Sequence, residues 1–253
     1  MTEPVRLVRV DSVGLLPYAE RLRALELEVR YPLDEGRDHF RIDHGPTYHT
    51  FFSGLGDAHF LVALAGEQVV GCFCGIFREA RQGGAPARRL RTVYLCDFKL
   101  ARPYRGAGVG VQMAWRALST MAEAPRFRSW QLGYFTTMRG EKGDVGRSLK
   151  GLHAGRLLQR EAVLAIHFAD PARLAALDVA SAPPPPPLEG GLDLSPQAGQ
   201  LMNVDGYCST SGRKDLIRDS GGAFLLAHYP TSPGDAGWAA GLKRLGESVV
   251  RKG

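Results

Sequence analysis

The sequence lacks the long apolar run that a membrane-spanning helix requires, since no stretch approaches about 18 to 20 consecutive apolar residues. Residues 1–11 alternate apolar and charged side chains and lack the apolar centre of a secretory signal. Cysteine is scarce, with four residues at scattered positions, too few for a disulfide scaffold. We therefore expect reduced thiols in a cytoplasmic protein that has no membrane partner.

The sequence also has little that resembles a metal site. Cys72 and Cys74 are close together, but no second pair of cysteines or histidines has a matching spacing. Four of the seven histidines, at positions 39, 44, 49 and 59, are five or ten residues apart, which fits no metal motif. We expect solvated histidines and no bound metal.

What is present is the composition of a globular protein, with 44% hydrophobic and 23% charged residues in 253. Positive charge is concentrated in residues 78–105, which contain eight basic and two acidic residues. This excess of +6 equals the net charge of the whole chain. Such an excess indicates an anionic partner, most commonly a phosphate. For residues 81–91 a solvated Arg-rich hairpin is the alternative. A nucleic-acid partner is unlikely because aromatic residues are not interleaved with the basic ones, although a tRNA-linked substrate stays open.

Hydrophobic periodicity predicts a mixed α/β (α+β) fold. Apolar residues stepping by three and four predict one helix with the face Leu15 to Val29, ended before Pro32, and a second with the face Val111, Trp115, Leu118 and Ala122. Residues 34–57 are rich in His, Gly and aromatic residues, which predicts a loop with a short helical turn that lines a binding site. A third helix is expected over 148–160. Strands are expected over residues 5–10, 59–64, 69–77, 92–100, 130–136 and 162–168.

Five consecutive prolines at 183–187 mark a domain boundary, because such a segment extends as a polyproline helix and does not join a packed core. We predict a main domain over 1–170, a linker over 171–191 and an extension over 192–253. The extension carries a strand over 223–228 and a helix whose face includes Trp238 and Val249. About 60 residues are marginal for an independent fold. We expect the extension to dock on the main domain or on a partner subunit, which leaves a homodimer open.

The most informative motif is the stretch Arg105 to Gly110, which follows a predicted strand and opens a predicted helix. Glycines at 106, 108 and 110 allow successive backbone N–H groups to point into one concavity at the positive end of the helix. This is the chemistry of a pyrophosphate site. A P-loop needs Gly-Lys-Ser/Thr at the helix start, and a dinucleotide fingerprint needs a third glycine at position 111, where the residue is Val.

The pattern Arg105-x-x-Gly108-x-Gly110 resembles the GNAT superfamily of acyl-CoA-dependent N-acyltransferases. The hairpin ending in Val69-Val70-Gly71, the strand ending at Leu100, the glycine turn and the amphipathic helix follow the order of that family. The resemblance covers residues 5–168. It implies a mixed, mostly antiparallel central sheet flanked by helices. The strand–helix extension after residue 170 has no counterpart in this resemblance.

The resemblance implies binding of acetyl-CoA as co-substrate, with Phe98 and Leu100 near the pantetheine arm. The pyrophosphate would be held by the turn residues Arg105, Gly106, Ala107, Gly108, Val109 and Gly110. A primary amine, on a small molecule or a peptide, would attack the thioester directly in a ternary complex. A backbone N–H of the strand 92–100 would stabilise the oxyanion, and Arg102 is a candidate for the remaining phosphate.

The sequence offers few candidates for the residues that transfer protons. Asp97 lies on the motif strand and is the candidate base, although pairing with Arg91 or Lys99 is the alternative. The family often places its acid in a Tyr that follows an Asn after the fifth strand, and residues 138–160 contain neither. Tyr134 is the first substitute, ahead of Ser148 and His153. This departure keeps a second function open, a non-catalytic acyl-CoA-binding sensor or interaction module.

Overall fold

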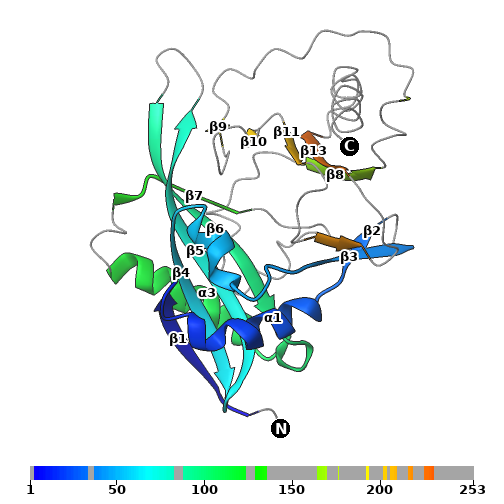
Figure 1. Ribbon diagram of the computed structural model, residues 1–253. Helices are drawn as coiled ribbons and strands as arrows, with labels where there is room; N and C mark the ends of the chain where they lie inside the picture. The colour runs from blue at the N-terminus through cyan, green and yellow to red at the C-terminus, as the bar shows by residue number, and fades with distance from the viewer. Residues whose placement is uncertain are drawn as a thin grey trace. The chain divides into compact units, whose positions relative to one another are not determined.

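The computed structural model describes residues 3–33, 37–82, 88–123, 129–135, 164–169, 176, 192–193, 202–203, 206–209, 216–218 and 225–230 (Figure 1). These residues divide into two units, and each is described by itself. The predicted break at 83–86 and the predicted helices over 148–160 and 238–249 lie outside the described residues. The predicted linker 171–191 also lies outside them, apart from Ala176.

The main sheet has the strand order β1-β4-β5-β6-β7, and its long neighbours β5 and β6 are visible in Figure 1. The β1/β4 and β4/β5 pairs are antiparallel, and β6/β7 is parallel. All five strands were predicted from the sequence. Their bounds are β1 Val5–Asp11, β4 Asp57–Ala65, β5 Gln68–Gln82, β6 Arg88–Leu100 and β7 Leu132–Phe135.

Helices cover both faces of this sheet. The helix α1 (Ala19–Leu27) follows a short 3₁₀ turn, α2 spans Tyr48–Ser53, and α3 spans Val109–Glu123. The Phe60 ring of β4 meets Phe52 of α2 at 5.4 Å, whereas the next residue, Leu61, lines a pocket with Ala117 of α3. Because successive strand residues face opposite sides, α2 and α3 lie on opposite faces. The mixed sheet flanked by helices is the α/β (α+β) architecture that the sequence predicts.

The segment 34–57 differs from the predicted loop. It contains the short helix α2, as expected, but also the strand β3 (Asp38–Ile42), which pairs with β2 (Tyr31–Leu33) and with β12 (Leu216–Arg218). Phe40 is buried and stacks on Tyr31 at 5.0 Å. The sequence conceals this strand because its apolar residues are few, and one of its two partners, β12, is distant in sequence.

The buried face of α3 also differs from the prediction. Val109 and Met113 are buried, whereas Trp115 and Leu118, predicted to face the core, are 54% and 42% exposed. The predicted face is therefore wrong at Trp115 and Leu118. Two sets of apolar residues repeat at helical spacing in this segment, and periodicity alone does not tell which of them the sheet covers.

The second unit contains a small sheet with the order β10-β11-β13-β8. Two of its strands, β8 (Leu164–Ala169) and β13 (Leu225–Pro230), coincide with predicted strands and pair antiparallel. The others are β10 (Met202–Asn203) and β11 (Gly206–Ser209), and β9 (Leu192–Asp193) pairs with the end of β5. None of the helices within the described residues is long and apolar enough to cross a membrane.

Candidate active site

The predicted pyrophosphate-binding turn lies between the end of β6 and the start of α3. Gly106 and Gly108 have φ angles of 84° and 79°, in the left-handed region that residues with a Cβ avoid. A Cβ at either position would meet nothing within 4 Å, so the space beside both glycines is open. Gln112 N donates to Gly108 O at 3.0 Å, which is the first hydrogen bond of α3. The glycines thus form an open turn at the N-terminus of a 15-residue helix.

The amides of this turn are not used by the fold. Within the part of the chain that the structure describes, no backbone N–H from Gly106 to Gly110 donates to a backbone acceptor. Residues Arg105 to Gly108 are exposed, whereas Val109 is buried and anchors the helix. The exposed N–H groups and the positive end of the helix dipole together favour an anion at this position.

The end of β6 lies directly beside the turn. Gly110 packs so closely that an added Cβ would lie 3.3 Å from Phe98 Cζ and 4.0 Å from Leu100 Cδ2. Arg105 turns back along the strand, and its Nε donates to Leu100 O at 2.7 Å. The structure therefore brings Phe98, Leu100, Arg105 and Gly110 together. Phe98 is half exposed, so it forms part of the wall beside the turn.

The backbone of β6 is irregular at Asp97, which has a φ of 55° and is the one non-glycine with positive φ among the described residues. Before this position, Val93 and Leu95 lie on the α3 face, where both approach Gly75. After it, Phe98 and Leu100 lie on that face. In a regular strand residues 97 and 99 would follow 93 and 95, so one extra residue has been inserted at Asp97, which is the geometry of a β-bulge.

The bulge turns Asp97 and Lys99 toward the face covered by α1 and α2. Lys99 is 5% exposed, and its Nζ donates to Asp97 Oδ1 and to Tyr48 OH at 3.0 Å. Tyr48 OH in turn donates to Asp97 Oδ2. Both carboxylate oxygens of Asp97 are therefore occupied, one by an ammonium and one by a phenol. Of the two pairings considered for Asp97 from the sequence, the structure shows the one with Lys99.

Two further residues complete this buried polar cluster, which comprises Glu26, His44, Tyr48, Asp97 and Lys99. Lys99 Nζ donates to Glu26 Oε1 at 2.6 Å, and Glu26 is 1% exposed at the end of α1. His44 Nδ1 lies 2.7 Å from the same oxygen, and the His44 backbone N–H donates to Glu26 Oε2 at 2.9 Å. The cluster thus connects α1, α2 and β6.

The charges within the cluster are fixed by its geometry. Burial by itself would raise the pKa of Asp97, but the adjacent Lys99 ammonium outweighs this, and the pKa lies below the usual aspartate value. Burial would lower the pKa of Lys99, yet Asp97 and Glu26 raise it above its usual value. Burial, followed by the Asp97 charge, raises the pKa of Tyr48 well above its usual range. At neutral pH the cluster therefore contains an ion pair and a neutral phenol.

A metal is a second interpretation of the same residues. Ligand atoms of Glu26, His44 and Asp97 lie within 4.8 Å of one another. The Lys99 ammonium already lies among them, bonded to both carboxylates. The lysine cation therefore lies between the two carboxylates, where an ion would have to bind, and we assign no ion to this group.

Tyr134, the candidate acid, lies on β7 opposite Tyr94 of β6, and the two rings stack at 5.0 Å with an interplanar angle of 16°. Burial raises the pKa of Tyr134, so the phenol is protonated at neutral pH. Tyr94 precedes Asp97 by three residues. Among the described residues no contact joins Tyr134 to the buried cluster. Ser148 and His153, the other candidates, lie outside the described residues.

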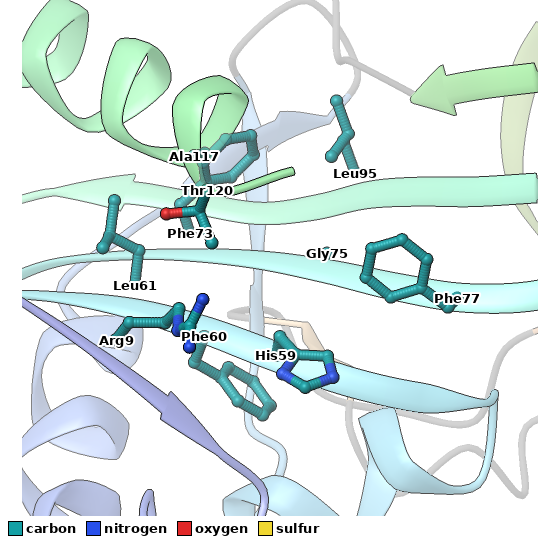
Figure 2. A pocket seen from close by; sticks show the side chains of 10 residues that line it. All are labelled: Arg9, His59, Phe60, Leu61, Phe73, Gly75, Phe77, Leu95, Ala117 and Thr120. Carbon is teal, nitrogen blue, oxygen red and sulfur yellow. The ribbon is translucent and has the colours of Figure 1, made fainter. Parts of the chain in front are cut away.

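The α3 face of the sheet has a small apolar pocket (Figure 2). Figure 2 shows Ala117 and Thr120 of α3 on one side and Phe73, Gly75 and Leu95 of the sheet on the other. His59 lies at the edge of the pocket, where its Nε2 is 3.1 Å from Asp57 Oδ1 and its ring contacts the Phe77 ring. The pocket is separate from the glycine turn and contributes no polar group to it.

Four residues of the buried cluster were not singled out from the sequence as site residues: Glu26, His44, Tyr48 and Lys99. The only signal was the content of the segment 34–57, whose His and aromatic residues indicated a binding site. Lys99 was considered only as a pairing partner of Asp97, because regular alternation from Val93 and Leu95 places both residues on the other face. The bulge at Asp97 brings Asp97 and Lys99 to Glu26 and Tyr48.

Residues 21–137 match the model of the acetyltransferase (GNAT) family. This match begins in α1 and ends just after β7, so it includes the buried cluster and the glycine turn. Residues 21–137 therefore form a GNAT acetyltransferase domain, and the activity that this family defines is acyl transfer. No curated protein matches the chain.

Several solved structures are similar to the chain at low identity. An aminoglycoside acetyltransferase from an uncultured soil metagenomic sample, in complex with sisomicin, is 12% identical over 66% of this chain and 95% of its own, with a TM-score of 0.42. A ribosomal-protein-alanine N-acetyltransferase from Brucella melitensis biovar Abortus 2308 is 16% identical over 64% of this chain and 98% of its own, with a TM-score of 0.40. A predicted acetyltransferase with acetyl-CoA from Clostridium acetobutylicum is 12% identical over 62% of this chain and 92% of its own, with a TM-score of 0.39. At these scores the similarities carry no argument about the acceptor.

Proposed function

We propose that this chain transfers an acetyl group from acetyl-CoA to a primary amine of a small molecule or peptide. The observation that carries the proposal is the open turn of Gly106 and Gly108 at the N-terminus of α3, with backbone N–H groups that donate to no backbone acceptor among the described residues. A diphosphate supplies the acceptors that these donors lack.

The residues around the turn fit the rest of the cofactor. Residues Arg105, Gly106, Ala107, Gly108, Val109 and Gly110 would hold the pyrophosphate, and the half-exposed Phe98 and Leu100 would contact the pantetheine arm. Gly110 lies close to Phe98, and a side chain at this position would require the Phe98 ring to shift by a few tenths of an ångström.

The proposed reaction takes place in a ternary complex. The amine nitrogen attacks the thioester carbonyl carbon, the C–N bond forms, and the C–S bond breaks with its electron pair leaving on sulfur. A backbone N–H of β6 next to the bulge would stabilise the oxyanion. One proton leaves the amine and one reaches the thiolate, so the products are an amide and free CoA.

The residues that would transfer protons in this reaction are also proposals. Asp97 remains the candidate base, and Tyr134, a neutral phenol, remains the candidate acid. Both oxygens of Asp97 are bonded within the buried cluster, so Asp97 would accept a proton only through rearrangement of Tyr48 or through a water. This observation favours the alternative function, an acyl-CoA-binding module without turnover.

The two functions separate in one pair of assays. We expect acetyl-CoA at about 100 times its Kd to stabilise the protein by about 2.7 kcal/mol in a thermal-shift experiment. An enzyme would also release thiol with at least one member of a panel of amines. Binding without thiol release across the panel would support the sensor, and no binding would reject both functions.

A double variant tests the assigned site. Arg105→Ala with Gly108→Glu places a carboxylate in the proposed diphosphate position and should abolish acetyl-CoA binding. Gly45→Glu is a matched control, because Gly45 has a nearly equal φ of 77° and equally open surroundings. The control introduces the same backbone strain and charge away from the turn, so it should keep acetyl-CoA affinity. Retained affinity in the double variant would reject the site.

A further inference from the structure

The bulge at Asp97 has a consequence for the cofactor site on the opposite face of the sheet. Phe98 and Leu100 reach Gly110 only because the strand gains one residue at Asp97. Without the bulge, Lys99 would point to the α3 face, and Phe98 would point into the polar surroundings of Glu26 and Tyr48. The side chains that would contact the pantetheine arm therefore depend on a backbone conformation that residues with a Cβ seldom adopt.

Lys99 is bonded in a way that fixes this conformation. An ammonium has three N–H donors, and Lys99 Nζ has three acceptors: Glu26 Oε1, Tyr48 OH and Asp97 Oδ1. Every donor is used, and the side chain is almost fully buried. A buried polar group whose donors are all satisfied stabilises one arrangement over its alternatives.

We propose that Lys99 is a positioning residue: its ammonium, held by Glu26 of α1 and Tyr48 of α2, keeps Asp97 in the left-handed bulge and so directs Phe98 and Leu100 to the acyl-CoA side. This inference rests on the proposed function for its effect on the cofactor. It assigns Lys99 no contact with either substrate.

The surrounding residues support the view that Lys99 positions β6 and is not itself positioned by it. Glu26 accepts hydrogen bonds from the backbone N–H and the Nδ1 of His44. These bonds fix the position of the Glu26 carboxylate independently of Lys99. Tyr48 is fully buried in the aromatic core of α2 and contacts Phe52. On the other face, the Phe98 ring packs against Phe73 at 5.3 Å. The two helices thus define where Lys99 lies, and Lys99 defines the strand.

The principal test is the charge-balanced variant Lys99→Met with Glu26→Gln. It removes one cation and one anion, so the cluster keeps its formal charge while losing the ammonium. We expect the Kd for acetyl-CoA, measured by calorimetry, to rise about tenfold or more, a loss of about 1.4 kcal/mol. Hydrogen exchange of the peptide that contains residues 96–100 should also become faster than in the unchanged protein.

A milder variant keeps the test informative if the double variant does not fold. Tyr48→Phe removes one hydroxyl from the cluster, retains its volume, and should produce a smaller change in the same direction in both measurements. Val62→Ala is the control: it removes buried volume from β4, outside the cluster, and should leave the Kd unchanged. A folded double variant, or Tyr48→Phe, with unchanged Kd and unchanged exchange over 96–100 would overturn the inference.

The hydrogen-exchange measurement needs no ligand, so the two failures are distinguishable. If the unchanged protein does not bind acetyl-CoA, the proposed function is rejected, and faster exchange over residues 96–100 in the variants still supports the role of Lys99 in the bulge. If acetyl-CoA binds and the variants match the unchanged protein in both measurements, only the inference about Lys99 is rejected.

Discussion

Gly71 and Gly75 lie on the same strand, β5, but their surroundings differ at the level of single atoms. A Cβ at Gly71 would lie 3.1 Å from the backbone Lys99 O, 3.1 Å from Leu100 Cδ1 and 3.2 Å from Ala63 Cβ. A Cβ at Gly75 would meet nothing nearer than 3.8 Å. The glycine in the Val69-Val70-Gly71 pattern therefore allows β6 to approach β5 beside the bulge.

We predict that Gly71→Ala lowers the free energy of unfolding by about 1–3 kcal/mol, because the new methyl group overpacks against a backbone carbonyl that does not give way. Gly75→Ala is the matched control and should change it by less than about 1 kcal/mol, since its methyl group has room. Urea denaturation of both variants provides the measurement. Equal effects at the two positions would contradict the packing described here.

The ion pair of Arg23 and Asp43 makes a second prediction at this scale. Arg23 Nε and Nη2 each donate to a separate oxygen of Asp43 at 2.7 Å, and these hydrogen bonds lower the pKa of Asp43. A lowered carboxyl pKa stabilises the fold at pH values above the unfolded pKa of about 3.9, and this stabilisation is lost as the pH falls through the folded pKa.

Asp43→Asn should therefore be less stable than the unchanged protein by about 1 kcal/mol at pH 6. The difference should shrink as the pH falls below about 4, where Asp43 is protonated first in the unfolded state, and should be lost once the pH is below the folded pKa. Urea denaturation between pH 3 and pH 7 measures this. A difference that is the same at pH 3 and pH 6 would show that the charge of Asp43 is not its cause.

Among the elements, α3 shows most clearly what periodicity leaves undecided. Its apolar residues fit two faces, and the structure buries Met113 while leaving Trp115 more than half exposed. Met113→Ala should lower the free energy of unfolding by about 2–5 kcal/mol through cavity formation. Trp115→Ala should cost less than about 1 kcal/mol, because little of its contact is lost. Chemical denaturation distinguishes them, and a larger loss for Trp115→Ala would restore the face predicted from the sequence.

The strands illustrate a different limit of the sequence. The main-sheet strands were predictable because each is a dense run of apolar and β-branched residues between turn signals, as in residues 59–64 and 69–77. The strand β3 was not, since its polar residues give no alternation and its stability comes from pairing with β2 and β12. Burial of Phe40 against Tyr31 is a tertiary fact that local pattern does not contain.

For the whole molecule, the net charge of +6 and the exposed turn predict a salt dependence. The Debye length falls from about 10 Å at 0.1 M salt to about 3 Å at 1 M, so screening should weaken acetyl-CoA binding several-fold over that range. Acetyl-pantetheine, which carries no phosphate, is the control and should bind equally at both concentrations. An affinity for acetyl-CoA that does not change with salt would argue against a diphosphate at the turn.

The domain boundaries, the homodimer and the tRNA-linked substrate stay predictions at this scale. Binding of tRNA would show a much steeper loss of affinity with salt, because many phosphates would release counterions. The pairing of β12 with β3 shows that residues 216–218, far beyond the proline run, contribute a strand to the sheet beside α1.

The sequence by itself determined the positions of the main-sheet strands along the chain, the glycine turn and the family resemblance, because each depends on local runs of a few residues. Spaced glycines and an arginine before a helix favour a turn whose backbone N–H groups can bind an anion. The tertiary structure alone decided which side chains surround Asp97. A single left-handed residue reversed the alternation of β6, buried Lys99 with Glu26 and Tyr48, and turned Phe98 to the opposite face. Such a reversal depends on contacts from three elements distant in sequence.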